Sequence, residues 1–128
     1  MSIKKVITLS ALVLTSIIVF AYTSKNTKVL RHVVLFKFKA EATAAQIKIV
    51  EDAFKVLPSK IKEVKSFEWG INNSTEGLND GLTHCFFVTF KNEKDRATYL
   101  PHPDHKAFVA LLLPFLEKAV VVDYWAEK

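Results

Sequence analysis

Hydrophobic and polar residues alternate through residues 29–39, VLRHVVLFKFK, with the two-residue period that is typical of a β-strand. Large side chains such as Phe36 fall on one side of this strand, and the other side also carries apolar residues, so we expect both faces to be largely buried. The period changes to that of an amphipathic helix over residues 43–57, where Thr43 can cap the start and Pro58 follows the end.

The second half of the chain continues with further strand and helix patterns. A half-exposed strand (64–71), a polar loop (72–81), a buried strand (83–90), two helices (92–100 and 102–118) and a last strand (119–125) follow in that order. This order predicts an α+β fold, a ferredoxin-like four-stranded antiparallel sheet with helices on one face. We further expect the first and third strands to be parallel central neighbours, which would place His32 and His84 side by side, about 5 Å apart.

A second apolar face is predicted on the side of the sheet away from the helices. Val33, Leu35, Phe87 and Val121 are expected to contribute to it. A small sheet does not leave such a face in water. We therefore expect a homodimer in which two sheets close into a dimeric α/β barrel.

The first residues have the composition of a secretory signal. Lys4 and Lys5 precede an uncharged apolar run over residues 6–21, and a polar segment follows. The small residues Val19 and Ala21 predict cleavage of a signal peptide (1–21), which leaves a linker (22–28) and one domain (29–128) in the periplasm or outside the cell. After cleavage no membrane association is expected. The alternative is an uncleaved segment that anchors the N-terminus in the membrane.

The composition narrows the possible functions. The 128 residues are 50% hydrophobic and 24% charged, which suffices for the core of one domain. The formal net charge of +5 includes Lys4 and Lys5, and the modest excess that remains argues against binding nucleic acid. Cys85 is the single cysteine, so it cannot form a disulfide within the chain, and we expect it to be a small buried apolar residue. Four dispersed histidines and three glycines match neither a zinc site nor a phosphate-binding loop, so we expect no metal and no cofactor.

Candidate acid–base chemistry lies in the stretch YLPHPDHKAF. His102 fits a helix N-cap and Pro103 the first helical position, which places His105 at the positive end of a helix. That field disfavours imidazolium, so His105 should be neutral and able to accept a proton. The Tyr99 hydroxyl could then donate a hydrogen bond to an enolate oxygen that develops nearby.

Three further polar residues lie on the predicted strands. His32 and His84 either line a pocket with Tyr99 and His105, or are buried histidines satisfied by backbone groups or by each other. Asp123 is expected to have a structural role, by accepting a bond from a side chain of a neighbouring strand.

Four stretches, LRHVVLFKFK, GLTHCFFVTF, YLPHPDHKAF and VVDYW, resemble in order and spacing the stress-responsive dimeric A/B barrel (Dabb) family over residues 30–125. The resemblance implies the ferredoxin-like fold and the homodimer. A branch of the family, the plant polyketide cyclases, is similar at His32, His84, Tyr99 and His105. It implies Tyr99 and His105 as catalytic residues, and we take His32 and His84 as ligand-binding residues.

Two functions remain open. The first is a cofactor-free enzyme that acts on a small carbonyl compound, with His105 as the base and Tyr99 as the hydrogen-bond donor to the oxyanion. The second is a non-catalytic dimeric barrel that binds a small apolar molecule or serves as a stress-related structural protein. We expect His32, His84, Tyr99 and His105 to converge on one pocket between sheet and helices. A cavity of a few hundred Å³ with Tyr99 and His105 on its wall favours the enzyme.

Overall fold

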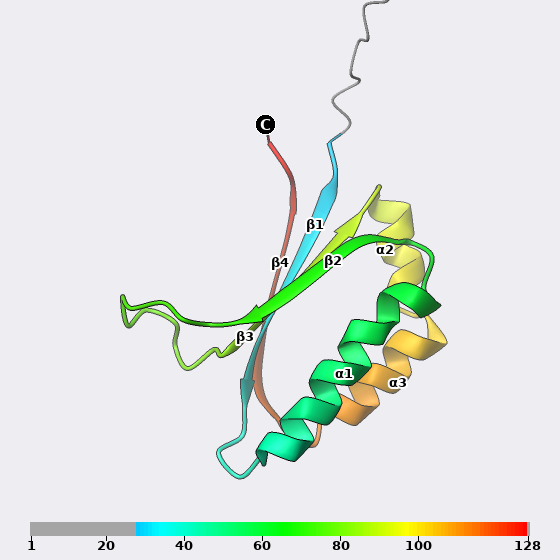
Figure 1. The fold of residues 1–128 in the computed structure, drawn as a ribbon. Helices are drawn as coiled ribbons and strands as arrows, with labels where there is room; N and C mark the ends of the chain where they lie inside the picture. The colour runs from blue at the N-terminus through cyan, green and yellow to red at the C-terminus, as the bar shows by residue number, and fades with distance from the viewer. Residues whose placement is uncertain (1–27, 128) are drawn as a thin grey trace, which may run out of the picture.

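The computed structural model describes residues 28–127, so the predicted signal (1–21) and nearly all of the predicted linker lie outside the described residues. The elements in chain order are β1 (Leu30–Phe38), α1 (Ala44–Lys60), β2 (Val64–Ile71), β3 (His84–Phe90), α2 (Glu93–Tyr99), α3 (Pro103–Leu112) and β4 (Leu116–Trp125). The helices lie together on one side of the sheet, and the loop between β2 and β3 extends away from them (Figure 1).

The strands are ordered β2-β3-β1-β4 and every neighbouring pair is antiparallel, as the ferredoxin-like prediction requires. The expectation that β1 and β3 run parallel is wrong. His32 lies opposite Val88, and His84 lies opposite Phe36, four residues farther along β1. The connections explain the direction, because β2 returns parallel to β1 after α1, and the turn that follows reverses β3, which then inserts between β1 and β2. Four residues correspond to about 13 Å along a strand, so the two histidines are not neighbours.

The core lies between the sheet and the helices and is rich in phenylalanine. Phe54 of α1 stacks on Phe86 of β3 with 4.2 Å between ring centroids, and its ring lies 4.6 Å from that of Phe108 in α3. Phe36 of β1 lies beside Phe86 at 5.3 Å. All four side chains are at most 5% exposed. Burial of one such ring stabilises the fold by roughly 1.5–3 kcal/mol, so this cluster holds α1 and α3 against the sheet.

The end of α1 lies farther along the chain than predicted. Thr43 caps the helix as expected, but the helix continues through Pro58 to Lys60. A proline near a helix end removes only one backbone donor, because its ring has no N–H. Leu57 and Ile61 are almost fully buried on either side of Pro58, and their burial keeps this last turn against the core.

The chain also leaves α3 earlier than predicted. The helix ends at Leu112 and β4 begins at Leu116, whereas the pattern placed the helix over 102–118 and the strand over 119–125. Pro114 cannot supply the backbone N–H that a further helical turn needs. The apolar run over residues 111–116 therefore contains the end of a helix and the start of a strand.

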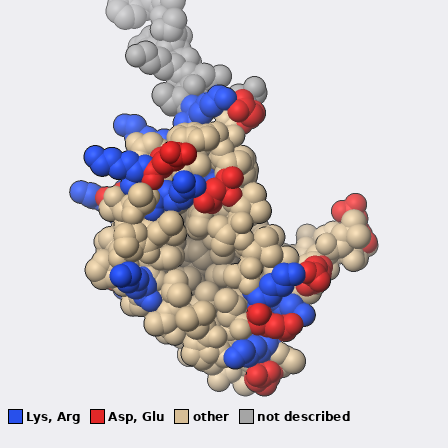
Figure 2. Space-filling view, turned by 180° about the vertical axis from the view of Figure 1, so that it is seen from behind, with Lys and Arg blue, Asp and Glu red and all other residues tan. Residues whose placement is uncertain are grey.

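The side of the sheet away from the helices is apolar in its middle. Its cross-strand neighbours are Val33 with Phe87 and Val122, and Leu35 with Cys85 and Val120; we call these six residues the bare sheet face. Val121 does not belong to it, contrary to expectation, because it pairs with Val34, which is buried beneath the helices. Seen from behind, the middle of the molecule is hollowed and carries no charged side chain, while charges gather toward its ends (Figure 2).

Candidate active site

A cavity of about 220 Å³ opens between the sheet and the C-terminal helices; we call it the helix-side cavity. Most of its wall is apolar, formed by Val34, Phe36, Phe54, Leu100, Phe108, Val109, Leu112, Leu113, Leu116, Ala119 and Val121. Three polar side chains complete it: His32 of β1, Tyr99 of α2 and His105 of α3. A mostly apolar wall with a few convergent polar groups is the usual form of a small-molecule site.

Tyr99, the last residue of α2, is 1% exposed. Its ring centroid lies 4.4 Å from that of His105 and 6.0 Å from that of His32, which it meets edge to face. The hydroxyl oxygen is buried and has no hydrogen-bond partner among the described residues. Burial raises the pKa of Tyr99 well above its ordinary value, so the hydroxyl keeps its proton and is a donor. Leaving such a group unpaired is unfavourable, so the cavity is suited to a ligand that accepts from it.

His105 is the third residue of α3, and His102 caps that helix by accepting from the backbone N–H of Asp104, as the sequence predicts. The Nδ1 atom of His105 lies 2.9 Å from the carbonyl oxygen of Leu100. A carbonyl only accepts, so Nδ1 carries the proton and Nε2 keeps its lone pair in the neutral ring. Burial lowers the pKa of His105; the hydrogen bond to the Leu100 carbonyl opposes this in part, and the nearby imidazoles of His32 and His102 lower the pKa further. The net direction favours the neutral imidazole that the sequence predicts.

His32 is buried beneath the helices at the β4 side of the cavity. Its Nδ1 lies 2.6 Å from Oδ1 of Asp123, which is directly opposite on β4. The other carboxylate oxygen of Asp123 accepts from Arg96 of α2 at 2.8 Å. The expectation that Asp123 accepts a bond from a side chain of a neighbouring strand is confirmed.

His84 does not join the other three residues, and the predicted convergence of four residues is wrong for it. Its Nε2 lies 3.0 Å from Oε1 of Glu51 in α1, and its Nδ1 lies 2.8 Å from the hydroxyl of Thr83. The ring of Trp69 is nearly parallel to the imidazole. Because β3 runs antiparallel to β1, the start of β3 lies beside the end of β1 and not beside His32. His84 is thus a buried histidine whose partners are side chains, and not the backbone groups or the second histidine that the sequence suggested; it lines a different hollow from the other three residues.

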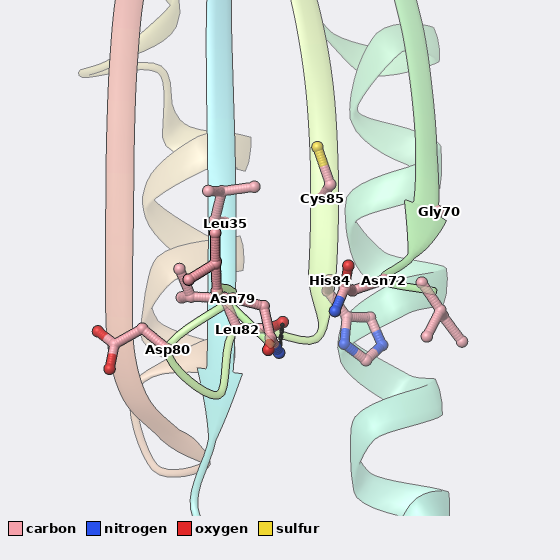
Figure 3. A pocket seen from close by; sticks show the side chains of 10 residues that line it. Leu35, Gly70, Asn72, Asn79, Asp80, Leu82, His84 and Cys85 are labelled. Atoms are coloured by element: carbon pink, nitrogen blue, oxygen red, sulfur yellow. Dashed lines mark hydrogen bonds between the residues drawn. The ribbon is translucent and has the colours of Figure 1, made fainter. Parts of the chain in front are cut away.

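A second hollow, of about 350 Å³, lies at this other end of the sheet, under the loop between β2 and β3 (Figure 3). Leu35 and Cys85 of the bare sheet face line it, together with Asn72, Asn79 and other loop residues. Cys85 is only half-buried in the single chain, and burial raises the pKa of its thiol. The thiol is therefore not activated as a nucleophile.

Arg96 was missed by sequence reasoning. It lies three residues before Tyr99 on α2, so both side chains can lie on the same side of that helix. This spacing was a usable signal, but the partner of Arg96, Asp123, is far away in sequence and only the fold brings the two together.

Residues 28–127 contain neither a metal-binding cluster nor a membrane-spanning helix. No group of three or more histidine, cysteine, aspartate or glutamate side chains in this range could hold a metal ion. Likewise, none of the helices in this range is long and apolar enough to cross a membrane.

Comparison with known proteins relates this geometry to a family. The family model for the stress responsive A/B barrel domain (Dabb) matches residues 30–126. A stress-response A/B barrel domain-containing protein of Arabidopsis thaliana is 35% identical over 94 residues, which are 73% of this chain and 86% of that protein. Olivetolic acid cyclase of Cannabis sativa is 31% identical over 98 residues, which are 77% of this chain and 97% of the cyclase.

Solved structures agree with this assignment. Hydroxynitrile lyase from Passiflora edulis superposes with a TM-score of 0.75 at 26% identity, covering 80% of this chain and 96% of the lyase. A dimeric protein of ferredoxin-like fold from Bacteroides fragilis superposes with a TM-score of 0.64 at 26% identity, covering 77% of this chain and 96% of that chain. Similar proteins thus include two named as enzymes and one described as a dimer.

Proposed function

We propose that this chain, which belongs to the stress-responsive A/B barrel (Dabb) family, is a cofactor-free enzyme that removes a proton next to the carbonyl group of a small, largely apolar compound. One observation carries the proposal. Tyr99, whose buried hydroxyl has no partner among the described residues, and His105, whose neutral ring carries its proton on Nδ1 and leaves Nε2 as an acceptor, line the same apolar cavity. Two similar proteins, a cyclase and a lyase, are named as enzymes, which agrees with a catalytic role.

The chemistry follows from the two side chains. Nε2 of His105 takes the proton from the carbon next to the carbonyl, and the electron pair of the broken C–H bond moves to form the enolate. The carbonyl oxygen gains negative charge and accepts a hydrogen bond from the Tyr99 hydroxyl, which has no competing partner within residues 28–127. Most of the cavity wall is apolar, and a hydrogen bond in such low-dielectric surroundings is stronger than in water.

A non-catalytic binding protein is the second candidate, favoured by the long apolar wall of the cavity. Leu100, Leu113 and Val121 line the cavity and are 44%, 58% and 52% exposed. The exposed apolar residues at the opening of the cavity can bind an apolar molecule even if no reaction takes place there.

Deuterium exchange separates these two candidates. The protein is incubated in D₂O with a panel of aryl and alkyl ketones, and loss of the α-proton signal is followed by NMR. We expect exchange with at least one ketone, and its loss in Tyr99→Phe and in His105→Ala. His102→Asn is the matched control, because asparagine also caps a helix and position 102 does not line the cavity. If a ketone binds but its α-protons do not exchange, the non-catalytic binding protein is the candidate that remains.

We also propose that the chain forms a homodimer through the bare sheet face. This face has apolar side chains in its middle and no helix over it among the described residues. Solved relatives that share the ferredoxin-like fold are described as dimeric. Burial of the six bare-face residues against a second copy would remove this apolar surface from water.

Export is proposed from the N-terminal pattern alone. Two lysines, an apolar run and small residues at positions 19 and 21 have the order of a secretory signal. N-terminal sequencing of protein recovered outside the cytoplasm should then begin near Tyr22. Recovery of an intact Met1 start from membranes would support the anchored alternative.

A further inference from the structure

A chain of hydrogen bonds outside the catalytic pair reaches the helix-side cavity from its β4 side. Arg96 of α2 donates to Oδ2 of Asp123, and Oδ1 of Asp123 lies 2.6 Å from Nδ1 of His32. His32 lines the cavity, and its side chain is only 7% exposed, whereas that of Asp123 is 29% exposed. The two residues behind His32 therefore control which hydrogen-bonding group His32 offers to a ligand.

The partners of His32 determine where its proton lies. An ionised carboxylate only accepts hydrogen bonds, so Nδ1 of His32 must donate to Asp123. The guanidinium of Arg96 already balances the charge of Asp123. In the neutral ring, donation from Nδ1 to Asp123 leaves Nε2 of His32 as an acceptor.

Three side chains supply the hydrogen-bonding groups of the cavity. His105 donates from Nδ1 to Leu100 and keeps an acceptor at Nε2, and His32 keeps one in the same way. Tyr99 supplies the donor, because its hydroxyl is protonated and has no partner among the described residues. These side chains thus offer one donor and two acceptors within an otherwise apolar wall.

We infer that Asp123 and Arg96 are positioning residues, and that the acceptor they create on His32 selects carbonyl compounds with a hydroxyl or enol O–H beside the carbonyl group. This inference rests on the proposed function. The carbonyl oxygen accepts from Tyr99, the carbon-bound proton faces His105, and the hydroxyl donates to Nε2 of His32. An analogue without the O–H leaves a buried acceptor unpaired, which is the arrangement that gives strong discrimination between similar ligands.

The first test measures the histidine tautomer directly. Long-range ¹⁵N–¹H NMR, recorded above the pH range in which histidines titrate, should show His32 with its proton on Nδ1. In Asp123→Asn only one side-chain oxygen remains, and Arg96 can only donate, so the oxygen turns toward Arg96 and the NH₂ group toward His32. The proton of His32 should then move to Nε2. A wild-type His32 protonated on Nε2, or an imidazolium, would overturn the inference.

The second test measures selectivity with a pair of probes, 2-hydroxyacetophenone and its methyl ether, 2-methoxyacetophenone. The hydroxyl compound should bind about tenfold more tightly to the wild-type protein, which is the effect of one satisfied hydrogen bond. This preference should disappear in Asp123→Asn. Asp52→Asn is the matched control, because Asp52 pairs only with lysines on the exposed side of α1, and it should keep the preference. Equal affinities in the wild type, or an unchanged preference in Asp123→Asn, would contradict the inference.

These outcomes are separate from those of the proposed function. If no ketone of the panel exchanges its α-proton in D₂O, these two probes included, catalysis is refuted, while the tautomer and the tenfold preference can still be observed. If exchange occurs without a preference for the hydroxyl compound, catalysis stands and the role of Asp123 and Arg96 is refuted.

Discussion

Replacing Tyr99 by phenylalanine should stabilise the fold while it removes function. The hydroxyl oxygen of Tyr99 is buried and has no partner among the described residues, and the side chain is 1% exposed. A buried polar group without a hydrogen bond costs about 1–3 kcal/mol. Phenylalanine keeps the ring contacts with Phe90 and His105, whose centroids lie 5.0 and 4.4 Å away, and removes only the unpaired group. We therefore expect the free energy of unfolding to rise by about 1 kcal/mol.

Urea denaturation at constant protein concentration, followed by far-UV circular dichroism, measures this change. A gain of about 1 kcal/mol corresponds to a rise in Tm on the order of 5 °C for a domain of this size. Thr98→Val is the matched control, because Thr98 is exposed on the same helix and its hydroxyl is exchanged for a methyl group at the surface, so the variant should change stability by less than about 0.5 kcal/mol. A loss of 1 kcal/mol or more in Tyr99→Phe would mean that the hydroxyl has a partner in the folded protein, which would refute the reasoning that makes it a free donor.

Three further predictions follow from the same contacts. Burial lowers the pKa of His105 in the folded chain below its ordinary value of 6.5. The stability that comes from its neutral form is therefore complete above pH 6.5 and is lost as the pH falls below that value. His105→Gln should weaken this loss of stability in acid, which urea denaturation across that pH range measures. Leu35→Asp should give a monomer or an unfolded chain in sedimentation, because an unpaired charge buried in the proposed interface costs several kcal/mol, whereas Val56→Asp on the exposed side of α1 should stay dimeric. Glu51→Ala should lower the free energy of unfolding by about 1–3 kcal/mol, because it leaves Nε2 of His84 buried without that partner. It should leave the affinity for 2-hydroxyacetophenone unchanged. A large loss of affinity would contradict the separation of His84 from the helix-side cavity.

The site was predicted from the sequence only in part. Tyr99 and His105 belong to one short stretch of the sequence, and the short connection between α2 and α3 keeps their rings close together. His32 comes from β1, and it reaches this cavity because β1 lies at the centre of the sheet. Asp123 was identified as a structural acceptor, but its pairing with Arg96 depends on β4 and α2 being adjacent in the fold.

The sequence by itself determined the order and type of the elements and several of their ends, because these depend on local chemistry. Side-chain periods of two and 3.6 residues distinguish strands from helices, and Thr43, Asn92 and His102 cap helices through bonds to the next few residues. The tertiary structure alone decided which residues share a site. Alternation along a strand is the same in both chain directions, so by itself it does not give the direction of β3; the predicted antiparallel sheet did require β3 to run against β1, and the expected pairing of His32 with His84 was inconsistent with it. That direction separates His84 from His32 and leaves His32, Tyr99 and His105 around one cavity.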